Sequence, residues 1–267
     1  KNDVSFDKEK TDQIFWGVFL AIPNMVWEDT CEIFMFNLHE KDGSNFQTKN
    51  REIYTPGFRF YRPAKNGSFD YEWESMFQFG TVRETKSPQD IGDLDHLAFF
   101  THLQIGYSFS GPWSPRLYFE YDYASGDDDP NDGTNERFDR LFGPNVPEFG
   151  PTHINTAFVR SNINSPGVRL LLRTSQKIFA YISYRAYWLA SNTDGWQGAS
   201  ELRDLQGDSG SFLGHQFLIR ANWKIHPNLK LEAGQTYRID GEFQKNVPTS
   251  PRKGNSAYTY TQITFLF

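Results

Sequence analysis

Several features that mark common protein classes are missing from this chain. Cysteine occurs once, at Cys31, which excludes an internal disulfide. No stretch approaches the roughly 20 apolar residues of a transmembrane helix. A net charge of -6 argues against a general nucleic-acid partner. The opening residues, KNDVSFDKEKTDQ, do not form a signal peptide, so we expect that a signal was removed or that the true start lies upstream.

Aromatic residues, by contrast, are abundant. They make up 17% of the chain, with 25 Phe and 13 Tyr, and such residues favour strands. The chain is nevertheless polar, with 38% hydrophobic residues and a mean hydropathy of -0.62. A fold is needed that combines aromatic strands with a polar composition.

Alternation of apolar and polar side chains predicts an all-β protein with almost no helix. Most segments span about ten residues, the length that a tilted strand needs to cross a bilayer. The pattern predicts about eleven strands, near residues 14–22, 31–38, 52–62, 69–80, 96–109, 116–124, 165–175, 178–190, 211–225, 229–239 and 257–267.

The two faces of these strands differ in an informative way. In the strand at 69–80, Phe69, Trp73 and Phe77 share one face, while Asp70 and Glu72 share the other. A soluble sandwich turns its polar face to water. An outer-membrane barrel is inverted, with apolar residues toward lipid and polar residues toward a wet lumen. Charges deep within aromatic strands therefore favour a transmembrane antiparallel up-and-down β-barrel.

The connections support this interpretation because their lengths alternate. From the third strand on, the short segments AKNG, SGPWSP, SQK and HPN separate long ones near 81–95, 125–164, 191–210 and 240–256. Short periplasmic turns and long external loops are typical of outer-membrane barrels. The last strand, ending at Phe267, would close the barrel at the periplasmic edge and engage the barrel-assembly machinery.

Strand parity gives a further expectation. With eleven strands and the last one running toward the periplasm, the first also runs toward the periplasm. Single-chain bacterial barrels have even strand numbers. We therefore expect residues 1–267 to form a single barrel domain that lacks an odd number of N-terminal strands.

Charged residues on the polar faces are the candidate solute-binding residues of the lumen. A charge on the lipid face costs about 2–4 kcal/mol at the bilayer midplane, so these side chains should point inward. They would guide anions or, alternatively, form salt bridges that hold the barrel's shape. The candidates are Arg59, Arg169, Arg173, Arg185, Arg220, Lys224, Lys230, Arg238, Asp70, Glu72, Glu74, Glu120 and Asp122.

The distribution of these charges along the chain predicts a field across the lumen. The acids lie on the earlier strands, and most of the bases lie on the later ones. Because successive strands are neighbours in an up-and-down barrel, we expect one acidic arc and one basic arc. Such a field favours hydrophilic, anionic solutes.

Other candidate sites are weaker. Alternate oxygens in the loop Asp127–Asp132 suit calcium, but the EF-hand spacing fails, and a solvated acidic turn is the other interpretation. The six histidines form no metal-spaced pair. No motif marks a nucleophile or a cofactor site, so we expect no catalytic residue, no metal and no cofactor. Outward tryptophans indicate aromatic girdles, and inward Tyr181 and Tyr187 could either stack on sugars or fill space.

Several stretches resemble the alginate export family of outer-membrane barrels. The strongest is GYSFSGPWSPRLYFEYDYASGDDDPNDGTNERFDRLFG, residues 106–143, which is similar to that family's strand–turn–strand–acidic-loop block. The segments YTPGFRFYRP, YRAYWLASNTDGW and FLGHQFLIRANWKIHPNLKLEAG resemble other blocks in the same order, so the resemblance covers roughly 51–267. It implies a barrel of eighteen strands with a charged, restricted lumen. The best-known member passes an anionic polysaccharide through a basic lumen, whereas acids accompany the arginines here.

Together these observations predict an integral protein of the Gram-negative bacterial outer membrane. It would pass polar, anionic solutes or polysaccharide by passive diffusion, with outer-membrane lipid as its surroundings and no nucleic acid as a partner. We do not expect an enzyme. Two alternatives remain: a soluble carbohydrate-binding β protein, and a structural barrel that sheathes a partner protein.

Overall fold

The computed structural model describes residues 12–43, 47–143, 149–152, 157–175, 177–197, 202–250 and 254–267. Eleven long strands follow one another: β1 (Gln13–Val26), β2 (Asp29–Glu40), β3 (Glu52–Arg62), β4 (Ser68–Val82), β5 (Leu94–Ser108), β6 (Arg116–Ala124), β8 (Ile163–Arg173), β9 (Ile178–Trp188), β10 (Phe212–His226), β11 (Leu229–Asp240) and β12 (Ser256–Phe265). The two-residue β7 (Thr134–Asn135) and the short helix α1 (Glu242–Asn246) complete the described elements.

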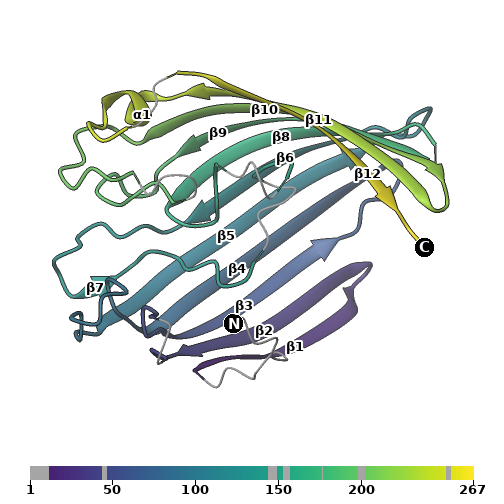
Figure 1. Ribbon diagram of the computed structural model, residues 1–267. Coiled ribbons are helices and arrows are strands. Elements are labelled where there is room, and N and C mark those ends of the chain that lie inside the picture. Colours follow the sequence, from purple (N-terminus) through teal and green to yellow (C-terminus); the bar gives the residue numbers. More distant parts are fainter. Residues whose placement is uncertain are drawn as a thin grey trace, which may run out of the picture.

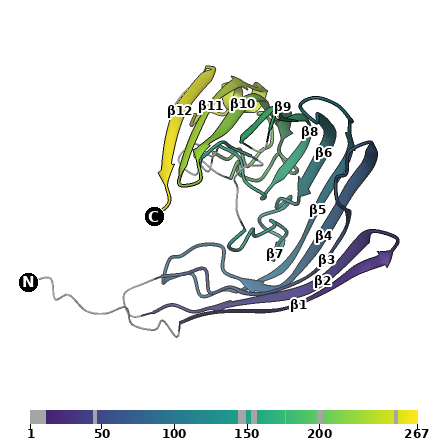
Figure 2. The same cartoon turned by 90° about the vertical axis from the view of Figure 1, so that its right-hand side faces the viewer.

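Each long strand pairs antiparallel with the next, so the sheet order is the chain order. Only β7 departs from this path, because it pairs in parallel with β5. The sheet bends into a deep trough and remains open, with β1 and β12 at its edges (Figures 1 and 2). The predicted all-β, antiparallel up-and-down architecture is confirmed. In the part of the chain that the structure describes, no helix is long and apolar enough to span a membrane.

The alternation of connection lengths is confirmed and extends back to the first strand. Short turns join strands at 27–28, 63–67, 109–115, 174–177 and 227–228, and longer connections fall between them. Because neighbouring strands run in opposite directions, all short turns lie at one rim and all long connections at the other (Figure 1). We call these the turn rim and the loop rim.

Side chains alternate between the two faces of the trough. On the convex face, Phe69, Phe77 and Phe119 are among many exposed apolar residues. On the concave face, the neighbouring positions Asp70, Gln78 and Glu120 are buried. This is the inverted arrangement that the sequence predicts, because a lipid-facing surface keeps apolar side chains outside.

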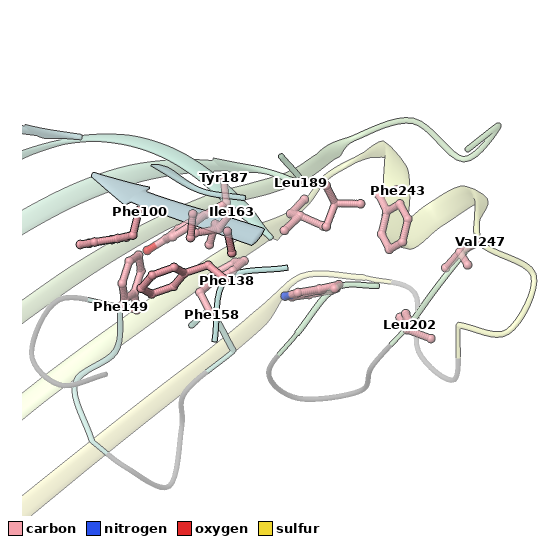
Figure 3. Close-up of a cluster of buried hydrophobic side chains, with 14 residues drawn as sticks. Phe100, Phe138, Phe149, Phe158, Ile163, Tyr187, Leu189, Leu202, Phe243 and Val247 are labelled. Atoms are coloured by element: carbon pink, nitrogen blue, oxygen red, sulfur yellow. The ribbon is translucent and has the colours of Figure 1, made fainter. Parts of the chain in front are cut away.

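A hydrophobic core lies inside the trough near the loop rim. Phe138, Phe149 and Phe158, from the connection at 125–162, pack on the inner residues Phe100 and Tyr187 (Figure 3). Ala98, Ala124, Ile163, Leu189, Trp196, Leu202, Leu213, Phe243 and Val247 join the same cluster. Near the loop rim, the inner faces of the strands are therefore apolar, and the expected polar inner face is wrong for this part of the sheet. The reason is that the long connection folds inward and covers these apolar positions.

Candidate functional site

Between this core and the turn rim, charged side chains occupy the inner face of the trough. Register shows that they share one side, since directly opposed residues point the same way. Arg59 opposes Glu74, Glu74 opposes His102, and His102 opposes Asp122. All thirteen residues predicted as lumen candidates occupy inward positions by this register.

Arg185 and Asp122 form the centre of this charged region. They lie on β9 and β6, and they form an ion pair across the intervening strand β8. Arg185 also lies 3.6 Å from the Glu120 carboxylate and donates from Nε to Ser165 Oγ at 3.1 Å. Arg185 is 1% exposed and Asp122 is 0% exposed. A pair so completely buried depends on close contact between its partners, because neither charge has water around it.

A glycine makes this crossing possible. Gly167 of β8 opposes Glu120 on one side and Arg185 on the other. A Cβ at Gly167 would lie 2.7 Å from Arg185 Cγ and 3.1 Å from Glu120 Cγ. The missing side chain leaves a gap on the inner face through which Arg185 reaches Asp122.

The same device recurs on β5. Arg116 of β6 forms an ion pair with Asp70 of β4, and Gly106 lies between them. A Cβ at Gly106 would lie 2.9 Å from Asp70 Oδ1. Glycines on middle strands therefore allow ion pairs between strands that are not themselves hydrogen-bonded.

Further pairs extend the network around the trough. Arg169 lies 3.3 Å from Glu120, and His102 Nδ1 lies 2.9 Å from Asp122 Oδ1. Near one edge Arg59 contacts Glu72 at 2.8 Å and Glu32 at 3.3 Å. Near the other edge Arg220 lies 2.7 Å from Glu232, and Arg238 lies 3.2 Å from Asp240. Most of the predicted candidates therefore take part in local pairs of opposite charge.

This pairing corrects the predicted field across the lumen. The acids of β6 contact the arginines of β8 and β9 directly, instead of facing them from an opposite arc. The earlier strands also carry Arg59 and Arg116 beside their own carboxylates. Charges of opposite sign within contact distance cancel at longer range, so the arcs are not acidic and basic as expected.

Three of the predicted cations have a different environment. Arg173, Lys224 and Lys230 are exposed inner residues near the turn rim. Lys224 and Lys230 oppose each other on β10 and β11. Lys177, in the adjoining turn, is also exposed, and its carbonyl accepts a hydrogen bond from the Lys224 N–H at 2.8 Å. We call Arg173, Lys177, Lys224 and Lys230 the basic collar. Glu232, 3.6 Å from Lys230, is the acid beside it.

The two inner tyrosines fill space. Tyr187 is 0% exposed and stacks on Phe158 with ring centroids 3.6 Å apart. Tyr181 is buried beneath Arg169, whose guanidinium carbon lies 5.0 Å from the ring centroid. Neither ring presents a face to a passing solute, so the stacking role considered for them is excluded. Trp73 and Trp223 lie exposed on the convex face, as a girdle requires.

The acidic loop is organised by local contacts. Asp129 Oδ1 accepts from the Asn131 N–H at 3.1 Å, and Asp132 Oδ1 accepts from the Thr134 N–H at 2.8 Å. Asp127 is buried beside Asp194, and this burial, with the neighbouring negative charge, raises the pKa of the Asp127 carboxyl. Among the residues that the structure describes, no three His, Cys, Asp or Glu side chains form a group that could hold a metal ion.

Sequence reasoning missed two cations of the charged region. Arg116 begins β6 directly after a turn. It lies an even number of positions before Glu120 and Asp122, so the alternation of the strand could have shown that it faces inward. Arg160 lies in the long connection and approaches Asp122 to 3.8 Å. No local pattern predicts that contact, because it depends on how the connection folds into the trough.

Comparison with known families adds one match. The family model described as Alginate export matches residues 1–256, nearly the whole chain. A search of curated proteins found no match. The matched family is one of outer-membrane β-barrels with a role in transport, which agrees with the trough, its apolar convex face and its charged concave face.

Proposed function

This chain belongs to the alginate export family, and on that premise we propose that its concave face lines an outer-membrane channel for polar solutes. Transport is by passive diffusion, and anions are the favoured solutes. The observation that carries this proposal is the separation of the inner cations into two groups. Buried arginines are paired with carboxylates, whereas the basic collar is exposed.

Ion pairs between strands that are not neighbours support the shape of the channel wall. Arg185 and Asp122 tie β9 to β6, and Arg116 and Asp70 tie β6 to β4. The charges of these four side chains are paired within the wall. They are therefore poor contacts for a solute, and they hold the spacing of strands that are not neighbours.

The basic collar is suited to meet solutes. Its three strand residues, Arg173, Lys224 and Lys230, project from the inner face where the core no longer fills the trough. Cations at a channel opening with low-dielectric walls raise the local concentration of anions. The core near the loop rim narrows the trough and restricts passage to small or extended solutes.

A planar bilayer experiment tests the collar. We expect Arg173→Glu, Lys224→Glu and Lys230→Glu combined to shift the reversal potential in a salt gradient toward cation selectivity. The matched control is Lys86→Glu, an exposed lysine in the connection at the loop rim, which should leave selectivity near that of the parent protein. A folded triple variant with unchanged selectivity would refute the role of the collar.

A further inference from the structure

Glu74 differs from the other carboxylates on the inner face of the strands. Each of the others lies within 3.3 Å of an arginine nitrogen. These paired acids are Asp29, Glu32, Glu40, Asp70, Glu72, Glu120, Asp122, Glu232 and Asp240. In the part of the chain that the structure describes, the Glu74 carboxylate forms no hydrogen bond and no ion pair, and other charges act on it only from a longer distance.

Arg59, which opposes Glu74 on β3, is held by two other acids. Its guanidinium lies 2.8 Å from Glu72 and 3.3 Å from Glu32. This part of the wall therefore brings three carboxylates to one guanidinium and is negative overall. Because Arg59 contacts the other two acids, the uncompensated charge is that of Glu74.

The bases on the other side of Glu74 are also engaged elsewhere. His102 opposes Glu74 on β5, and its Nδ1 lies 2.9 Å from Asp122 Oδ1. Arg160 acts on the Glu74 charge from a longer distance and approaches Asp122 to 3.8 Å. Both bases therefore contact Asp122, and Glu74 keeps its acceptor sites for another partner.

Glu74 lies where the inner core ends. Phe100 belongs to that core (Figure 3), and Met76, directly opposed to it, packs against the core. Glu74 and His102 form the next inner pair toward the turn rim. The Glu74 side chain is partly buried, whereas His102 is buried. A solute that moves along the narrowed part of the trough therefore passes the Glu74 carboxylate.

The chemistry of this carboxylate selects a cationic donor. An ionised carboxylate has only acceptor sites, and its strongest hydrogen bonds are those from charged donors. Partial burial strengthens such a bond, because the local dielectric is lower than that of water. A metal ion is a poorer partner, since no three His, Cys, Asp or Glu side chains among the described residues form a group that could hold one.

We propose that Glu74 binds the ammonium group of solutes that pass along the concave face. The basic collar attracts an anionic group, and Glu74 accepts a cationic one. The solute class that suits both is a small zwitterion with one carboxylate and one ammonium group, as in an amino acid. This inference names a solute class for the proposed channel and rests on that proposal.

Calorimetric titration of the full chain in detergent tests the inference with three probes. Ethylammonium carries only the ammonium group, propionate carries only the carboxylate, and β-alanine carries both. Glu74→Gln keeps the size of the side chain and removes its charge. It should weaken the binding of ethylammonium and β-alanine about tenfold and leave propionate binding unchanged. No ethylammonium binding by the folded parent, or equal binding by parent and variant, would overturn the proposal.

Two further variants separate charge from structure. Glu84→Gln is the matched control, an exposed glutamate in a connection at the loop rim, and it should bind all three probes as the parent does. Glu74→Asp keeps the charge and should bind ethylammonium more tightly than Glu74→Gln. An equal loss in the Glu84 variant, or equal binding by the two Glu74 variants, would contradict the assignment.

The inference and the proposed channel can fail separately. Ethylammonium binding that does not depend on Glu74, in a protein whose anion selectivity depends on the collar, would remove only the ammonium site. Glu74-dependent ethylammonium binding by a protein that conducts no ions would remove only the channel.

Discussion

Replacement of Gly167 by alanine should disrupt the centre of the charged network. The added methyl carbon would lie 2.7 Å from Arg185 Cγ, 3.1 Å from Glu120 Cγ and 3.1 Å from the Tyr184 carbonyl oxygen. Contacts under 3 Å between carbons are repulsive, and the strand on either side is hydrogen-bonded into the sheet. Arg185 must therefore move, and its contact with fully buried Asp122 is the one that is lost.

The cost follows from what remains beside Asp122. Removal of one partner from a buried ion pair costs about 3–5 kcal/mol, because the other charge is left without compensation. His102 and Arg160 stay near Asp122 and reduce this penalty. We therefore expect a loss near the lower end, about 3 kcal/mol in the free energy of unfolding.

Urea unfolding of the protein in lipid vesicles, followed by tryptophan fluorescence, measures this loss. Gly92→Ala is the control, since nothing lies within 4 Å of a Cβ at Gly92, and its midpoint should stay near that of the parent. A second test places Gly167→Ala in a chain that already carries Arg185→Leu and Asp122→Leu. There the alanine should cost much less, because the pair that it disrupts is gone. An unchanged midpoint for Gly167→Ala alone would refute the reasoning.

Three further predictions concern the outer surface and the long connection. Phe119→Arg places a charge on the convex face and should destabilise the protein in lipid by about 2–4 kcal/mol; urea unfolding equal to that of the parent would favour the soluble alternative. Phe158→Ala removes a fully buried ring from the inner core and should cost about 3–5 kcal/mol of core packing, seen as faster limited proteolysis within 125–162; an unchanged cleavage rate would contradict the inward packing. A hydrogen bond with Asp128 raises the pKa of Glu136 to about 7. The protonated carboxyl therefore supports this connection fully below about pH 4.5, and the support is lost as the pH rises through about 7. The protection factors of amide hydrogens in 125–143, which are corrected for the intrinsic rise of exchange with pH, should fall across that range. Glu136→Gln should abolish this fall, and protection factors in the parent that do not change with pH would count against the prediction.

Strand positions could be predicted because they depend on local chemistry. The predicted segments 52–62 and 116–124 coincide with β3 and β6, and most other ends differ by a few residues. The period of two in side-chain direction is a property of any extended chain. It therefore also predicted which residues face inward, including all thirteen lumen candidates.

The partners of those residues could not be predicted in this way. Arg185 and Asp122 are 63 positions apart in the chain, and their contact needs a specific register across three strands. The alternation of side chains along each strand placed acids and bases on the same face of the sheet. The further prediction, that they form one acidic arc and one basic arc, was wrong. The role of Gly167 also depends on register, because Glu120 and Arg185 lie on either side of it only in the folded sheet.

Composition and alternation by themselves determined an inverted β sheet with an apolar exterior, a charged interior and two unlike rims, because these follow from side-chain chemistry and from the directions of neighbouring strands. Only the tertiary structure decided which inner charges are neutralised and which stay exposed, and that Phe138, Phe149 and Phe158 build a core within the trough. It also showed that β1, apolar on both faces, contributes Phe15 to an inner cavity. These features depend on how the long connection folds back over the strands, and its course is set by many distant contacts that leave no periodic trace along the chain.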